Sequence, residues 1–214
     1  MQEVAACPGA LGVEMNDENE AEPGRSVDEA AITKPIIVAI GASAGGIQAL
    51  RTFFAALPGS TGAAFVVVVH LDPGRRSELA SILGMRTRMP VVQVEGNARL
   101  LPDSVYVIPP DRRLQLIDHE ISAAEFDEPR GQRAPIDLFF RSVAERLGDG
   151  FAVILSGAGS DGAVGVKAVK ESGGIILVQD PNEAEYSSMP RSAIATGVAD
   201  FILPVPPTTI RRSL

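Results

Sequence analysis

The architecture of this chain can be predicted outward from one segment, Ile36-Ile37-Val38-Ala39-Ile40-Gly41-Ala42-Ser43-Ala44-Gly45-Gly46. Residues 36–40 form a short apolar run, as in a buried strand. Gly41 ends the run. Apolar residues then recur at helical spacing, at Ile47, Leu50, Phe53, Phe54 and Leu57. The segment therefore predicts a strand, a tight glycine turn and a helix, the unit from which parallel sheets are built.

The same rhythm of strand, turn and helix continues along the chain. We expect further strands at 65–69, 91–94, 105–108, 151–155, 175–178 and 201–203, and helices at 77–85, 135–147, 163–171 and 189–196. Two more strands, at 114–117 and 121–124, flank a polar turn and predict a hairpin. The whole pattern predicts a doubly wound α/β domain. It has a mostly parallel sheet with helices on both faces and a β-hairpin excursion near residues 112–125.

Charge divides the chain into a leader and a body. Residues 1–34 hold eight acidic and two basic side chains, so most of the formal net charge of −8 lies there. We expect 1–34 to be an acidic, disordered leader, with an interaction arm as the alternative. We expect 35–204 to be one domain and 205–214 a C-terminal tail or the start of a linker. The nearly neutral body predicts no nucleic-acid partner and no binding to anionic membranes.

Cysteine and hydropathy patterns exclude several classes of protein. Cys7 is the only cysteine, so the chain can form no internal disulfide. The first residues lack the cationic and apolar pattern of a secretory signal, and no apolar run reaches the roughly 20 residues that cross a bilayer. One cysteine and two distant histidines cannot form an ordinary zinc site. We expect a cytoplasmic protein with no membrane insertion, no metal and no cofactor.

Three polar residues, Ser43, His70 and Asp161, follow the ends of predicted strands. In an open parallel sheet, ligands bind beyond the carboxyl ends of the strands. Serine, histidine and aspartate are the types that supply a nucleophile, a general base and a group that orients the base. The three residues therefore predict the catalytic site of a serine hydrolase.

The turn from Gly41 to Gly45 matches the G-x-S-x-G pattern of a nucleophile elbow between a strand and a helix. The N–H groups of Ala44 and Gly45 would stabilise an oxyanion there. Two alternatives stay open: Ser43 could only cap the helix, or the turn could bind a dinucleotide. The dinucleotide pattern needs glycine where Ser43 stands and an acidic residue about 20 positions onward.

Each partner of Ser43 also has a competing interpretation. His70 could be structural, although it ends a strand beside the one that leads to Ser43, whereas His119 lies in the hairpin turn and should face solvent. Asp161 could cap the helix that follows it. Asp72 could orient the histidine instead, but it lies only two residues from His70.

Five ordered blocks resemble the catalytic domain of the CheB-type chemotaxis protein-glutamate methylesterases. They are Ile40-Gly41-Ala42-Ser43-Ala44-Gly45-Gly46, Val69-His70-Leu71, Tyr106-Val107-Ile108-Pro109-Pro110, Leu155-Ser156-Gly157-Ala158-Gly159-Ser160-Asp161-Gly162 and Ser188-Met189-Pro190-Arg191-Ser192-Ala193. The resemblance implies that Ser43, His70 and Asp161 are the catalytic residues. It implies hydrolysis of glutamyl methyl esters on methylated chemoreceptors or receptor-like proteins, and deamidation of receptor glutamines.

Several features depart from the family pattern. Residues 1–34 are too short for the receiver domain of the chemotaxis enzymes, so regulation by phosphorylation is not expected. Ala44 stands where many members have threonine, while Ala158 and Ser160 replace methionine and asparagine. The alternative function is a catalytically weak regulatory or binding module of the same fold. The glycine-turn sequences resemble the subgroup fused to methyltransferase and sensor domains, which implies a covalently fused partner domain.

Overall fold

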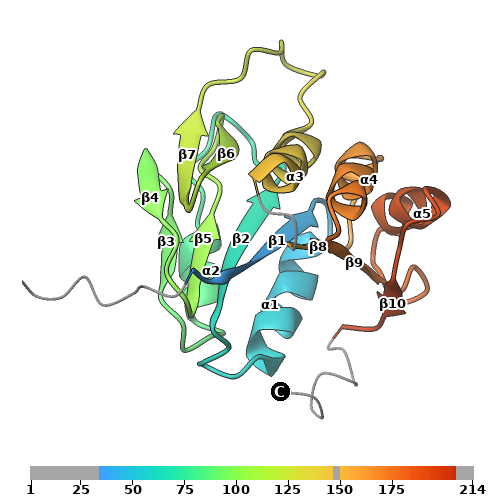
Figure 1. Ribbon diagram of the computed structural model, residues 1–214, viewed down its shortest axis with the longest axis horizontal. Coiled ribbons are helices and arrows are strands. Elements are labelled where there is room, and N and C mark those ends of the chain that lie inside the picture. Colours follow the sequence, from blue (N-terminus) through green and yellow to red (C-terminus); the bar gives the residue numbers. More distant parts are fainter. Residues whose placement is uncertain (1–33, 147–149, 206–214) are drawn as a thin grey trace, which may run out of the picture. The chain divides into compact units, whose positions relative to one another are not determined.

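The computed structural model describes residues 34–146 and 150–205 of the chain. Within these ranges the main sheet has seven strands in the order β10-β9-β8-β1-β2-β5-β3 (Figure 1). Every pairing between them is parallel, as predicted. The strands span Ile36–Ala42 (β1), Ala63–Val69 (β2), Val91–Gln93 (β3), Ser104–Val107 (β5), Phe151–Ile154 (β8), Ile175–Gln179 (β9) and Phe201–Leu203 (β10).

Helices cover both faces of this sheet, which confirms the doubly wound class (Figure 1). On one face lie α1 (Gly46–Ala56) and α2 (Leu79–Gly84), and on the other α3 (Pro135–Arg146), α4 (Ala163–Glu171) and α5 (Ser188–Ala195). Neighbouring residues of one strand pack into different clusters: Ala39 contacts the α3 side and Ile40 the α1 side. A strand buried on both faces must be apolar at every position, which is why β2 reads as a continuous apolar run.

A second, antiparallel sheet has the order β4-β7-β6, with strands at Asn97–Arg99 (β4), Arg113–Ile117 (β6) and Glu120–Ala124 (β7). The predicted hairpin of β6 and β7 is confirmed. The sequence prediction missed β4, a three-residue strand with two exposed positions and little apolar pattern. Leu114, Leu116 and Ile121 are buried and join the core on the α3 side of the main sheet.

Other differences from the predicted elements concern their ends. The helix predicted at 77–85 is shorter, because Ser77 accepts the Leu79 N–H at 3.2 Å in a local turn before α2 begins.

One prediction about exposure is wrong: His119, expected to face solvent, is half-buried. Predictions for the leader to residue 33, for Leu147 and for 206–214 lie outside the described residues.

The topology brings the carboxyl ends of three neighbouring strands to one edge of the sheet. β1 pairs with β2 on one side and with β8 on the other. Ser43 follows β1, His70 follows β2 and the loop from Leu155 to Gly162 follows β8. This edge is where open parallel sheets bind ligands. No helix in the described part of the chain is long and apolar enough to span a bilayer.

Candidate active site

Ser43 lies in a turn whose backbone is held on both sides. Its N–H donates to the carbonyl oxygen of Ser156 at 3.0 Å, and its own carbonyl oxygen accepts from Gly46 N–H at 2.9 Å. The N-cap of α1 is Gly45, in the left-handed region at φ 70°, and no side chain caps this helix. The interpretation of Ser43 as a helix cap is therefore wrong, and its hydroxyl is left for another partner.

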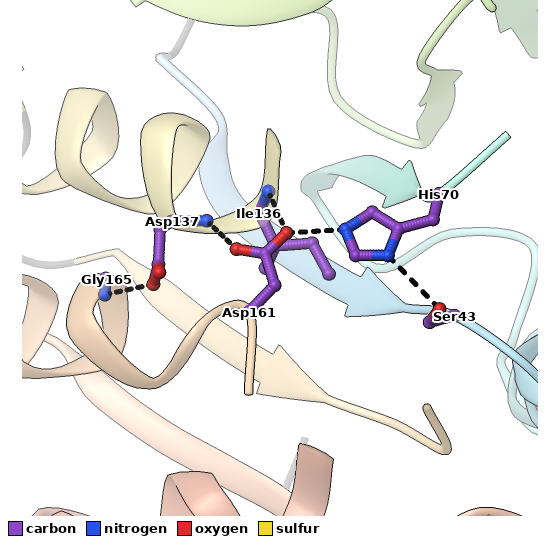
Figure 2. A network of polar contacts seen from close by, with 6 residues as sticks. All are labelled: Ser43, His70, Ile136, Asp137, Asp161 and Gly165. Atoms are coloured by element: carbon purple, nitrogen blue, oxygen red, sulfur yellow. Dashed lines mark hydrogen bonds and ion pairs between the residues drawn. The ribbon is translucent and has the colours of Figure 1, made fainter. Parts of the chain in front are cut away.

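His70 directly follows the last residue of β2, and its ring lies beside the hydroxyl of Ser43 (Figure 2). Its Nδ1 is 3.2 Å from the Oγ of Ser43. The opposite nitrogen, Nε2, is 2.7 Å from Oδ2 of Asp161. The side chain of His70 is 36% exposed, so it can be reached from solvent, whereas that of Asp161 is 8% exposed. The structure thus brings together the three residues predicted from strand ends.

Asp161 is held by the first turn of α3 and not by α4, the helix that follows it in the sequence. Its Oδ2 accepts the N–H of Ile136 at 3.0 Å, and its Oδ1 accepts the N–H of Asp137 at 2.9 Å (Figure 2). These N–H groups lie in the first turn of α3, where a helix has no internal acceptors for them. The N-cap of α4 is Gly162, without a side-chain cap. The expected alternative, in which Asp161 caps α4, is therefore wrong.

We assign the histidine tautomer from these two contacts. An ionised carboxylate only accepts hydrogen bonds, so Nε2 carries the proton that it donates to Asp161. Nδ1 is then unprotonated and can accept the hydroxyl proton of Ser43. In the familiar Ser-His-Asp arrangement the two nitrogens have the opposite assignment. The order of groups is nevertheless the same: hydroxyl, imidazole, buried carboxylate.

Asp72, the competing candidate for orienting His70, has other partners. Its Oδ1 accepts the N–H of Gly74 at 2.9 Å, and its Oδ2 is 3.5 Å from Nε of Arg75. It closes a local turn after β2. The structure therefore places Asp161, and not Asp72, against the imidazole.

Asp137 is a half-buried carboxylate that the sequence analysis did not single out. Its Oδ1 accepts the N–H of Gly165 at 2.6 Å and so joins α3 to α4 (Figure 2). Burial raises the pKa of Asp137 above its ordinary value, while the bond from Gly165 opposes that rise. The only signal in the sequence is an acidic residue in the first turn of a helix.

Two cavities adjoin His70, and one of them also adjoins Ser43. A cavity of about 450 Å³ is lined by Ser43, Ala44, Gly45, His70 and Glu185, among others. A second, of about 330 Å³, extends from His70 toward Phe126 and Arg130. Within residues 34–146 and 150–205, the N–H groups of Ala44 and Gly45 donate to no protein acceptor. A substrate carbonyl in the first cavity would meet an activated hydroxyl and free N–H donors.

Known proteins provide independent comparisons. The sequence pattern of the CheB methylesterase family matches residues 38–211. The crystal structure of the Thermotoga maritima CheB methylesterase catalytic domain is similar at a TM-score of 0.73 and 32% identity, covering 80% of this chain and 93% of that one. A protein of Leptospira interrogans is 37% identical over 168 residues, which make up 78% of this chain and 87% of that protein. Its name, protein-glutamate methylesterase/protein-glutamine glutaminase, was assigned by inference.

Two longer relatives contain the same region as part of a larger chain. A protein-glutamate methylesterase/protein-glutamine glutaminase of Photorhabdus laumondii is 32% identical over 79% of this chain, and the matched region makes up 49% of that longer protein. A 104.1 kDa protein of Rhodobacter capsulatus is 46% identical over 58% of this chain, and the matched region makes up 13% of that protein. The family pattern, the relatives and the fold agree, and the chain belongs to the CheB methylesterase family.

Proposed function

We propose that this protein is a serine hydrolase that removes methyl esters from glutamate side chains of chemoreceptor-type proteins. The observation that carries the proposal is the hydrogen-bonded series from Ser43 through His70 to Asp161 at the carboxyl edge of the sheet. In this proposal Ser43 is the nucleophile, His70 the general base and Asp161 the group that orients it. Ala44 and Gly45 supply N–H donors to the oxyanion.

The first half of the reaction forms an acyl-enzyme. His70 Nδ1 takes the hydroxyl proton as Ser43 Oγ bonds to the ester carbonyl carbon, and the carbonyl oxygen becomes an oxyanion. When the tetrahedral intermediate collapses, the bond to the methoxy group breaks. His70 returns its proton to that group and methanol leaves. Asp161 stabilises the imidazolium that forms between the two proton transfers.

The second half regenerates the enzyme. His70 takes a proton from water as the water oxygen attacks the acyl carbon. Collapse then breaks the bond to Ser43 Oγ, which recovers its proton, and releases the glutamate side chain. The same steps with a glutamine side chain release ammonia in place of methanol. These steps use only side chains and N–H groups of the chain and need no cofactor.

The comparisons support the choice of substrate. Relatives that share the region carry names for both the methylesterase and the glutaminase activity. Family membership favours ester hydrolysis over dinucleotide binding at the glycine turn. We further propose that the substrate is a methylated chemoreceptor or receptor-like protein. A covalently fused methyltransferase or sensor domain is proposed as a partner, because the region forms 13% of one longer relative.

Methanol release from a methylated receptor tests this function. Ser43→Ala should abolish it, whereas Ser81→Ala, at an exposed position in α2, should retain the wild-type rate. A fluorophosphonate probe should label the wild type and not Ser43→Ala. Failure of the wild type to release methanol or to take the label would favour the alternative, a regulatory module of the same fold.

A further inference from the structure

Ser156 is a buried residue that forms hydrogen bonds to the turn of Ser43 through both its backbone and its side chain. It is 1% exposed and lies just beyond the end of β8. Its carbonyl oxygen accepts the N–H of Ser43 at 3.0 Å. Its hydroxyl oxygen is 3.1 Å from the carbonyl oxygen of Ala44. One buried residue therefore contacts the backbone of the proposed nucleophile and of the residue that follows it.

The hydroxyl proton of Ser156 can be assigned from its neighbours. A serine hydroxyl donates one hydrogen bond and accepts others. The N–H of Tyr186 donates to Ser156 Oγ at 3.0 Å. The Tyr186 carbonyl oxygen is 3.5 Å away and already accepts from Gly157 at 3.0 Å. The Ala44 carbonyl is nearer and has no other hydrogen bond within the described ranges. Ser156 therefore donates to Ala44.

This bond determines the direction of the next N–H group. The C=O and N–H of a trans peptide point in opposite directions. Because the Ala44 carbonyl points toward Ser156, the Gly45 N–H points away from it. Ala44 and Gly45 both line the cavity that contains Ser43 and His70. The hydroxyl of Ser156 thus leaves the Gly45 N–H free to meet a ligand.

We propose that Ser156 is a positioning residue that holds the peptide between Ala44 and Gly45 in the orientation in which its N–H stabilises the oxyanion. The inference rests on the proposed function, because it takes Ser43 as the nucleophile. Ser156 forms and breaks no covalent bond in the reaction. Its contribution grows as negative charge develops on the substrate oxygen, so it should affect the transition state more than substrate binding.

Ser142 provides a matched control for the loss of a buried hydroxyl. It is 7% exposed, donates to the carbonyl oxygen of Phe139 at 2.7 Å and accepts the N–H of Leu116 at 3.0 Å. These are the same two kinds of hydrogen bond that Ser156 makes, but they join α3 to β6 instead of supporting the turn. Ser142→Ala should therefore reproduce the structural cost of Ser156→Ala without its effect on the reaction.

The experiment compares kcat and KM of the full chain on p-nitrophenyl acetate and on a methyl-esterified peptide. We expect Ser156→Ala to lower kcat about 10- to 100-fold, somewhat less than deleting an oxyanion donor, with KM within about twofold. Ser156→Cys fills the same space but is a weak donor, so its kcat should fall similarly. Ser142→Ala should stay within about twofold of the wild-type kcat.

A second measurement separates transition-state from ground-state effects. A peptide boronic acid forms a tetrahedral adduct with the serine oxygen and should lose affinity in Ser156→Ala by about the same factor as kcat. Affinity for the unmethylated product peptide should not change. A merely structural role would weaken both ligands together.

The inference is overturned if folded Ser156→Ala keeps the wild-type kcat, or if Ser142→Ala loses as much. If Ser156→Ala does not fold, Ser156→Cys decides in the same way. Failure of the proposed function looks different: the wild type would release no methanol from the receptor. Dependence of p-nitrophenyl acetate hydrolysis on Ser156 would then still support the inference.

Discussion

At the scale of single residues, the site depends on a carboxylate with three hydrogen bonds. Asp161 contacts the ring of His70 and the N–H groups of Ile136 and Asp137. The two backbone donors fix both carboxylate oxygens, so the imidazole meets an acceptor whose position is already set. This arrangement orients His70 without ordering a flexible side chain during the reaction.

Replacing Asp161 should therefore affect activity strongly. In Asp161→Asn one carboxylate oxygen becomes an NH2 group, which must face either the imidazole or the N–H groups of α3 as a second donor. We expect kcat for methanol release to fall by about 10⁴-fold, as when the triad aspartate of a serine protease is neutralised. Asp72→Asn is the matched control, because Asp72 lies near His70 in sequence but contacts Gly74 and Arg75 in its own turn and not the imidazole. Similar rates for the two variants would contradict the assignment of Asp161.

The conformation of Gly45 leads to a second prediction at this scale. Its φ is 70°, and an added Cβ would lie 2.8 Å from Ser156 Oγ and 2.9 Å from Glu185. Gly62 has φ 75° but nothing within 4 Å of its Cβ position. Both changes to alanine should cost about 1–2 kcal/mol for the left-handed backbone. Gly45→Ala should also lower kcat, since the turn of Ser43 must shift. Chemical denaturation and the methanol assay measure the two effects, and unchanged kcat would show that the turn tolerates the methyl group.

At the scale of elements, Asp103 joins the segment before β2 to the start of β5. Its carboxylate accepts the N–H groups of Thr61 and Gly62, the latter at 2.7 Å, and the hydroxyl of Ser60 at 3.1 Å. The backbone hydrogen bonds from Thr61 and Gly62 lower the pKa of Asp103 below 3.8. A single side chain thereby sets how two neighbouring strands enter the sheet.

The lowered pKa of Asp103 predicts a pH-dependent stability. The charged carboxylate stabilises the folded state above its ordinary pKa of 3.8, and this contribution is lost as pH falls through the lower, folded pKa. Asp103→Asn should therefore lower Tm at neutral pH, and the difference from wild type should shrink as the pH falls below 3.8. Asp118→Asn is the control, because Asp118 is an exposed turn residue whose φ of 56° is close to the 55° of Asp103. A difference in Tm that does not change with pH would contradict the prediction.

At the scale of the whole molecule, the main sheet separates two apolar clusters. The larger joins α3, α4, α5 and the small sheet, while the other lies under α1 and α2. Phe54 is fully buried in the second cluster and packs edge-to-face on Phe53 at 5.3 Å and on Phe65 at 5.7 Å. These aromatic contacts fix α1, and with it the turn that precedes α1, against the sheet.

Truncation of this aromatic cluster should destabilise the protein. We expect Phe54→Ala to lower the free energy of unfolding by about 3–5 kcal/mol, because it removes buried area and leaves a cavity. Phe201→Ala on β10, where the residue is 52% exposed, should cost much less. Denaturant unfolding of both variants measures the difference. Equal midpoints would mean that the α1 side of the sheet contributes little to the stability of the fold.

Local patterns predicted the elements where one signal dominated. The bounds of α4 and β10 agree with the prediction, because glycines and apolar runs mark their ends in the sequence. The strand β4 was missed because three residues with two exposed positions carry no periodicity. The helix-cap interpretations of Ser43 and Asp161 were wrong because Gly45 and Gly162, each with positive φ, hold the N-cap positions.

The sequence by itself determined the fold class and the three polar residues after strand ends, since apolar periodicity and glycine turns are local properties of the chain. Tertiary structure decided how those residues are held. Asp161 meets His70 across 91 positions of sequence and rests on the first turn of α3, while Ser156 supports the turn of Ser43 from 112 positions beyond Ala44. Such contacts depend on β8 lying beside β1. Local spacing does not encode which strands become neighbours, because that choice follows from the packing of both faces at once.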